Sequence, residues 1–244
     1  MALLMEDSPE TDEAPRAALP KTPVLITAAT NWEYAPLAKA LGLSEAAPGR
    51  SEGTVAGRKV VLLRTGIGAK NAADSLGRGF VPSDFGLAIS AGLCGAMQKE
   101  ARTGDLVADA REVDLDLVKS LRETALKLEL PFHFGKILHT NIVLKPAAKK
   151  TLGDEQRALA CDMETASLRR WADGKTAAIA VRVVLDEMNE EIPSDAPEGE
   201  DFASLARYAA SHAGSLPSLI RTGWRSARAM KTLSRFLKAY LGAI

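Results

Sequence analysis

One stretch decides the fold of this chain, Ala177-Ala-Ile-Ala-Val-Arg-Val-Val-Leu-Asp186. It is apolar almost without interruption up to Leu185, and such a run predicts a strand that is buried on both faces. Strands of this kind belong to sheets that helices cover on both sides. The stretch ends on the carboxylate of Asp186, and ligands in these folds bind at the carboxyl ends of the strands.

The segments on the N-terminal side of this strand alternate between short apolar runs and helical patterns. Strands are predicted over residues 24–27, 85–90, 105–108, 135–144 and 159–163, and a hairpin over residues 54–63. Helices are predicted over residues 32–41, 71–76, 115–130 and 165–171. Pro146 is interpreted as the residue that breaks the strand over 135–144. The alternation predicts an α/β domain.

The composition excludes several classes of function. Lysine plus arginine and aspartate plus glutamate both number 31, so the net charge is zero and no nucleic-acid partner is expected. The two cysteines, Cys94 and Cys161, have no companions at metal-ligand spacing, so no metal site is predicted. Two thiols without a disulfide framework suit a reducing compartment, and a cytoplasmic location is the expectation.

The two ends of the chain differ from its middle. Residues 1–22 are acidic and rich in proline, which predicts a disordered tail and is unlike a signal peptide. Residues 214–244 are predicted to form a basic amphipathic helix, which leaves residues 23–213 as the main domain. No apolar run approaches the roughly 20 residues that are needed to span a bilayer.

Two loops that follow predicted strands carry residues suited to a ligand. The stretch Thr27-Ala-Ala-Thr-Asn-Trp-Glu33 places Glu33 in the first turn of a helix, where it is either a functional group or an ordinary helix-start carboxylate. The stretch Arg64-Thr-Gly-Ile-Gly-Ala-Lys-Asn71 contains Gly66 and Gly68. These glycines either leave backbone amides free for a ligand or make a tight turn.

Two further loops have the same character. The stretch Ser90-Ala-Gly-Leu-Cys-Gly-Ala96 ends a strand with small residues, among them Gly92 and Cys94. Cys94 is interpreted as a packed small side chain, because no histidine lies nearby in the sequence to activate it. Asp162 and Asp186 end two successive strands, where each is either a helix cap or a member of a shared site.

Taken in this order, the loops resemble those of the nucleoside phosphorylase/nucleosidase superfamily. The likeness is to its methylthioadenosine/S-adenosylhomocysteine nucleosidases, futalosine hydrolases and hopanoid-associated phosphorylase-like proteins. The matching pieces lie between residues 24 and 190 and are Ala29-Thr-Asn-Trp-Glu33, Gly66-Ile-Gly68, Gly92-Leu-Cys-Gly95, Gly104-Asp-Leu-Val107, Asp162-Met-Glu164 and Arg182-Val-Val-Leu-Asp186. The resemblance implies a three-layer αβα sandwich around a mixed central sheet, a catalytic domain over residues 23–213, a homodimer and no cofactor.

The resemblance also implies roles for individual residues. Asp186 matches the acid that protonates N7 of a purine while the glycosidic bond breaks. Glu164 and Met163 match residues that hold the ribose hydroxyls, and Glu33 matches the carboxylate that activates water. The other substrate-binding residues that it implies are Gly66, Gly68, Gly92, Leu93, Cys94 and Val143. For Asp186 to be protonated near neutral pH, its pKa must be raised, most simply by desolvation.

Water is the expected nucleophile, and phosphate is the alternative. Phosphorylases of the hexameric branch place an arginine and a serine around the third loop, where this chain has Ser90 and Leu93. Leu93 cannot bind phosphate, although Arg64 and Lys70 could compensate for it. Glu33 would repel a phosphate dianion, which favours hydrolysis.

The chain departs from the nucleosidases in two places near the expected site. Leu185 precedes the acid where the nucleosidases carry serine. The segment from His139 to Val143 lacks their base-stacking aromatic residue, and Val143 takes its place with less contact area.

Residues 219–240 form the second informative region. One side of the predicted helix carries Leu219, Ala227, Met230, Leu233 and Leu237, and the other carries Trp224, Arg221, Arg225, Arg228, Arg235 and Lys238. Such a helix either packs on the core with a solvated basic face or lies on an anionic membrane surface. For a cytoplasmic protein, that surface is the inner face of the membrane. The stretch Gly214-Ser-Leu-Pro-Ser-Leu-Ile-Arg221 resembles the tail of the hopanoid-associated proteins, which implies adenosylhopane as substrate.

The expected function is therefore a purine nucleosidase that acts on an adenosyl compound, with adenosylhopane of hopanoid biosynthesis favoured. One alternative is a phosphate-dependent phosphorylase or a methylthioadenosine/S-adenosylhomocysteine nucleosidase. An alternative of another class is a non-catalytic nucleoside-binding protein, and a further one is a basic adaptor on a membrane surface.

Overall fold

The computed structural model describes residues 21–111, 113–191 and 216–244, with side chains in the last range from residue 221 onward. Most of the expected acidic tail and the start of the segment that resembles the hopanoid-associated proteins lie outside these residues. The division of the chain at residues 22 and 213 stays a prediction, because most of the tail and the residues on both sides of the second boundary fall outside the described ranges.

A mixed sheet forms the centre of the molecule. Its middle strands β1 (Val24–Ala28), β5 (Leu87–Ala96) and β10 (Ala177–Asp186) run parallel to one another. On one side follow β4 (Arg58–Arg64), β3 (Arg50–Val55) and β2 (Ser44–Ala47), and on the other β6 (Leu106–Asp109) and β7 (Phe132–Phe134). Both β3 and β6 run antiparallel to a neighbour. The expected mixed sheet is confirmed.

A smaller pair of strands branches from the far end of β5. β8 (Lys136–His139) pairs with β9 (Ala158–Asp162), and β9 pairs with the last residues of β5. Strand β5 therefore belongs both to the main sheet and to this branch.

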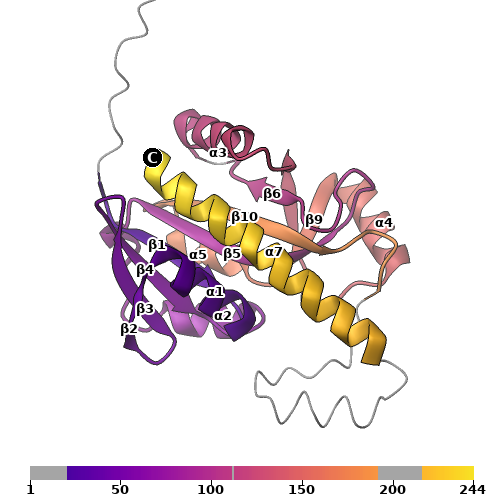
Figure 1. Cartoon of the computed structure of the whole chain (residues 1–244), viewed down its shortest axis with the longest axis horizontal. Helices are drawn as coiled ribbons and strands as arrows, with labels where there is room; N and C mark the ends of the chain where they lie inside the picture. The colour runs from indigo at the N-terminus through magenta and orange to yellow at the C-terminus, as the bar shows by residue number, and fades with distance from the viewer. Residues whose placement is uncertain (1–20, 112, 192–215) are drawn as a thin grey trace, which may run out of the picture.

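Helices cover both faces of the sheet, as the apolar character of β10 predicted. Helices α1 (Asn31–Leu41), α3 (Leu115–Lys127) and α7 (Leu216–Ala243) share one core with the sheet face that carries Ile179, Val181 and Val183. Helices α2 (Ala69–Leu76) and α5 (Thr165–Ala172) pack together on the opposite face, and α4 (Pro146–Gln156) packs on β9. A short 3-10 helix, η1 (Pro82–Asp84), precedes β5. Figure 1 shows α7 crossing β5 and β10, with α5 behind them.

The predicted strand over 135–144 is wrong in its second half. The strand β8 ends at His139, and a loop leads from there to Pro146. Pro146 does not merely end a strand, because it occupies the first turn of α4, where its missing N–H is not needed. Strand β5 is longer than predicted and continues from Ser90 to Ala96.

The C-terminal helix packs on the core. Met230, Leu233 and Leu237 are fully buried, together with Phe236 and Tyr240. Its basic residues lie on the outer side, and Ala227, which was expected on the apolar side, is exposed. The apolar side is therefore occupied by the protein's own core. In the part of the chain that the structure describes, no helix is long and apolar enough to cross a membrane.

Candidate active site

The register of the central strands brings loops from distant parts of the sequence to one edge of the sheet. Thr27 of β1 and Ala180 of β10 both lie opposite Ser90 of β5. Strand β1 ends at the next residue, Ala28, whereas β10 continues to Asp186, which lies opposite Gly95. Strand β9 runs antiparallel to β5, with Cys161 opposite Gly95, and its end therefore meets the same region.

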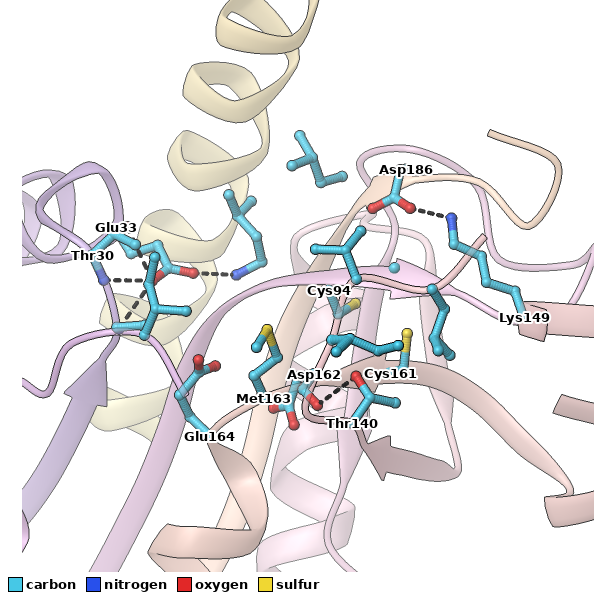
Figure 2. A pocket seen from close by; sticks show the side chains of 18 residues that line it. Thr30, Glu33, Cys94, Thr140, Lys149, Cys161, Asp162, Met163, Glu164 and Asp186 are labelled. Atoms are coloured by element: carbon cyan, nitrogen blue, oxygen red, sulfur yellow. Dashed lines mark hydrogen bonds and ion pairs between the residues drawn. The ribbon is translucent and has the colours of Figure 1, made fainter. Parts of the chain in front are cut away.

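A cavity of about 280 Å³ lies at this edge. The carboxyl groups of Glu33 at the start of α1, Glu164 at the start of α5 and Asp186 at the end of β10 all line it. Figure 2 shows the three side chains around a common space. Four other residues that the sequence pointed to are also part of the wall: Leu93, Cys94, Val143 and Met163.

The three expected glycines, Gly66, Gly68 and Gly92, are not part of the cavity wall. Gly92 instead lies behind it, where a side chain would not fit. A Cβ atom at this position would lie 2.3 Å from Oε1 of Glu33 and 2.6 Å from Nη1 of Arg182. The glycine therefore allows Glu33 and Arg182 to approach the backbone of β5.

Glu33 both caps a helix and faces the cavity. Its Oε2 accepts hydrogen bonds from the backbone N–H groups of Ala29 and Thr30, each at 3.0 Å. Its Oε1 accepts one from the N–H of Leu93 at 2.7 Å. A carboxylate oxygen has two lone pairs. Within the described ranges no second protein donor meets Oε1, so this oxygen can bind a water molecule.

Arg182 organises the acidic side of the site from the middle of β10. Its guanidinium is 1% exposed, and Nη2 lies 2.6 Å from Oδ2 of Asp162 and 3.5 Å from Oε2 of Glu164. The same nitrogen donates to Oγ of Ser90 at 2.6 Å. A buried cation needs such partners, because its desolvation is costly. Arg182 thereby fixes the carboxyl groups of Asp162, the last residue of β9, and of Glu164, two residues beyond it.

Glu164 is held at the boundary between the core and the cavity. Its Oε1 accepts a hydrogen bond from the N–H of Gly68 at 2.9 Å. The pKa of Glu164 is raised to about 7, chiefly by burial. Arg182 acts against this rise, and the nearby Asp162 and Glu33 add to it. This group can therefore change its charge near neutral pH.

Asp186 lies at the other end of the cavity and is 7% exposed. Burial raises its pKa above the ordinary range for aspartate, although the ammonium group of Lys149 acts in the opposite direction. Lys149 comes from α4, and its Nζ donates a hydrogen bond to Oδ2 of Asp186 (Figure 2).

The two cysteines are neutral wall residues. Burial raises the pKa of Cys161 to about 12 and that of Cys94 well above its ordinary value. A thiol in this state is a small apolar side chain rather than a nucleophile, which agrees with the interpretation of Cys94 from the sequence. The described residues hold no group of three or more His, Cys, Asp or Glu side chains that could bind a metal ion.

Two functional residues were not recognised in the sequence. The sequence motif that contains Arg182 indicates no role for it, although a cation within an apolar strand must find partners. Lys149 was missed because its helix was not predicted. Thr140 and Leu185 also line the cavity.

The comparisons with known proteins agree with this geometry at the level of the fold. No protein-family model and no curated protein matches the chain. Among solved structures it is similar to a 5'-methylthioadenosine/S-adenosylhomocysteine nucleosidase from Helicobacter pylori, with a TM-score of 0.69 and 15% identity over 91% of this chain and 99% of that one. The chain has the nucleosidase fold.

Two other nucleosidase structures give the same result. Futalosine hydrolase from Helicobacter pylori has a TM-score of 0.68 at 16% identity, covering 91% of this chain and 98% of that one. The 5'-methylthioadenosine/S-adenosylhomocysteine nucleosidase from S. pneumoniae has a TM-score of 0.65 at 20% identity, covering 91% of this chain and 99% of that one. The likeness extends over nearly the whole length of these nucleosidases.

Proposed function

We propose that the protein is a nucleosidase that uses water to cleave the N-glycosidic bond of a purine nucleoside. One observation carries the proposal. Glu33, Glu164 and Asp186 are far apart in the sequence and border a single cavity at the edge of the sheet. The nucleosidase fold supports it. A protein that only binds nucleosides would need no acid with a raised pKa at one end of the cavity.

Asp186 supplies the proton in this mechanism. Because burial raises its pKa, the carboxylic acid form persists to higher pH than in an ordinary aspartate. The acid gives its proton to N7 while the bond between C1' and N9 breaks, and the electron pair of that bond goes to the purine. General acid catalysis of this kind is worth roughly 10²–10⁴-fold.

The other two carboxyl groups act on the sugar. Glu164 accepts hydrogen bonds from the ribose hydroxyls beside Met163 and so orients a sugar that develops oxocarbenium-like charge. Glu33 binds a water molecule through Oε1 and takes its proton while the oxygen attacks C1'. The products are the free purine and a sugar with a hydroxyl group at C1'.

Water is the nucleophile that the surroundings favour. The hydroxyl of Ser90 is bound to Arg182, and Leu93 presents a leucine side chain to the cavity. Neither Arg64 nor Lys70 is part of the wall, so the compensation considered for phosphate has no support. A dianion would also meet the carboxylate of Glu33.

The test is incubation with adenosyl compounds that differ at the 5' position, each with and without phosphate. Methylthioadenosine, S-adenosylhomocysteine and adenosylhopane belong to the panel. We expect release of adenine and of free sugar without phosphate. A requirement for phosphate, with formation of ribose-1-phosphate, would contradict the choice of water. Release of no base from any compound would contradict the proposal itself.

Within this class we propose a lipid-linked adenosyl compound, such as adenosylhopane, as the substrate. Two large apolar residues of the cavity wall are unusually open to solvent, Ile142 at 67% and Val143 at 44% exposure. An apolar rim of this kind suits a hydrophobic 5' substituent that projects from the cavity.

A contact of this protein with the inner face of the membrane would be electrostatic. The apolar side of α7 is buried in the core, which leaves Trp224 and five exposed cations, Arg221, Arg228, Lys231, Arg235 and Lys238. Arg225 is instead paired with Glu190 at 2.7 Å. Sedimentation with anionic and zwitterionic vesicles tests the contact. We expect binding to anionic vesicles alone, lost at high salt, and absence of binding at low salt would contradict it.

The homodimer and the cytoplasmic location implied at the sequence level stay predictions. Sedimentation equilibrium of the full chain tests the dimer, and a single species of monomer mass at micromolar concentration would contradict it.

A further inference from the structure

We propose that Lys149 is a positioning residue for the reaction, which holds Asp186 in place and stabilises the carboxylate that Asp186 becomes when it gives up its proton. The inference rests on the proposed function and assigns a role to a residue that stands outside the carboxylate set.

The side chain of Lys149 has an unusual environment for a lysine. It is 1% exposed and lies on the inner face of α4, where a helix normally places an apolar residue. All three donors of its ammonium group are used: Oδ2 of Asp186 accepts one, and the carbonyl oxygens of Glu187 and Glu190 accept the others at 3.0 and 2.8 Å. Two carbonyl acceptors and one carboxylate match the three N–H donors of an ammonium group.

The loop after β10 is shaped around this ammonium group. The side chain of Glu190 accepts a hydrogen bond from the N–H of Glu187 at 3.0 Å, which closes a turn that directs both carbonyls at Lys149. Arg225 of α7 holds the other oxygen of Glu190 at 2.7 Å. Lys149 is therefore anchored by its own helix α4 and by the carbonyl groups of the loop. Helix α7 contributes indirectly, because Arg225 holds Glu190.

This arrangement matters because charge develops on Asp186 during the reaction. Before the bond breaks Asp186 is an acid, and afterwards it is a carboxylate with its proton on N7. An adjacent cation in a site with little water stabilises the later state more than the earlier one, which is the condition for acceleration. In each turnover Glu33 gains one proton from water and Asp186 loses one to the purine. Exchange of these protons with solvent returns both carboxyl groups to their starting states.

Other groups around Asp186 do not supply this charge. Glu190 raises the pKa of Asp186, while Cys94 on β5 and Cys161 on β9 face it as neutral thiols. Among these neighbours Lys149 is the cation. Its removal should therefore raise the pKa of Asp186 beyond the value that burial already produces.

The test compares Lys149→Met with Lys150→Met, because Lys150 is the exposed neighbour on the same helix. In Lys149→Met we expect kcat to fall about tenfold or more. We also expect the alkaline limb of the pH profile of kcat/KM to move to higher pH by about one unit or more. Lys149→Arg should keep the limb near its original pH, because it keeps the charge. Lys150→Met should change neither quantity.

A purely structural lysine would give a different result, since loss of folded enzyme lowers the rate without moving the limb. Lys149→Gln is the second variant in case the methionine variant does not fold. If a folded variant with an uncharged residue at position 149 keeps the alkaline limb of the kcat/KM profile at its original pH, the inference is overturned.

A measurement without turnover separates this inference from the proposed function. The ¹³C chemical shift of the Asp186 carboxyl, assigned by its loss in Asp186→Asn, is followed with pH in the wild type and in Lys149→Gln. A higher midpoint in Lys149→Gln supports the pairing even if no nucleoside is cleaved, and equal midpoints overturn it. Failure of the wild type to release base from the adenosyl panel counts against the proposed function alone.

Discussion

At the scale of single residues, three carboxyl groups of similar intrinsic acidity are placed in three different environments. Glu33 is bound by backbone N–H groups, Glu164 shares Arg182 with Asp162, and Asp186 is paired with Lys149. Different environments give carboxyl groups different tasks, because burial and partners set which one holds a proton.

Glu164 makes stability depend on pH in a direction that can be worked out. Its pKa is raised to about 7 in the folded protein from an ordinary 4.5, so the folded state binds the extra proton between these values. The wild type should therefore lose stability as pH rises through this window. In Glu164→Gln this loss is absent, so the variant should gain up to about 3 kcal/mol relative to the wild type between pH 4.5 and 8.

Urea unfolding of both proteins across this pH range measures the difference. If the free energy of unfolding of Glu164→Gln relative to that of the wild type stays constant or falls as pH rises, Glu164 does not carry the raised pKa.

Gly92→Ala tests the close approach of Glu33 and Arg182 to the backbone of β5 behind the cavity. The added methyl group would overlap Oε1 of Glu33 and the guanidinium of Arg182, so Glu33 must move. Displacement of a catalytic group by about 1 Å can cost roughly 10²-fold in rate. We expect a loss of base release of at least this size in protein that remains folded by circular dichroism. Activity close to that of the wild type would mean that Glu33 has no fixed position in the reaction.

At the scale of elements, the sequence predicted the strands and helices that bury a regular apolar pattern. Strand β10 and the amphipathic α3 were recognised for this reason. Helix α4 was not, because its buried positions are Lys149 and Gly153 rather than an apolar stripe. Pro146 in its first turn was the available signal, and it was interpreted only as the end of a strand.

The candidate site likewise contains residues that could be predicted from the sequence and residues that could not. The carboxyl groups were visible because they follow strands in an order that resembles nucleosidases. Their partners were not, because the pairing of Lys149 with Asp186 depends on contacts across 37 positions of the sequence. Register and helix packing create such contacts, and neither is written in a local pattern.

Helix α7 offers a prediction about local propensity. Gly223 lies within the helix and is exposed, and a Cβ atom there would meet nothing within 4 Å. Glycine inside a helix costs about 0.5–1 kcal/mol relative to alanine. Gly223→Ala should therefore raise the free energy of unfolding by about this amount, measured by urea titration. Destabilisation would indicate that another surface needs the glycine.

At the scale of the whole molecule, α7 lies across the middle of the sheet and contacts helices on both sides of it along the same face. It packs on α1, α3, β5 and β10, and Arg225 reaches the loop that holds Lys149. The stability of the core and the geometry around Asp186 thus share one element.

Phe236 is the residue at which this role can be measured. Its ring is fully buried and stacks on Phe132 and Tyr240. Phe236→Ala should lower the free energy of unfolding by about 3–5 kcal/mol, because a large cavity remains. The adjacent, exposed Arg235→Ala should change it by no more than about 0.5 kcal/mol. Similar effects of the two changes would contradict the packing of α7 on the sheet.

The most direct test of the central claim is the rate of adenine release by Asp186→Asn, measured beside equilibrium binding of the same adenosyl compound. Asparagine keeps the shape of the side chain and removes the proton that N7 needs. We predict that kcat falls by roughly 10²–10⁴-fold while the dissociation constant changes little. An unchanged rate, or wild-type binding with no turnover in either protein, would contradict the assignment of Asp186 as the acid of a nucleosidase.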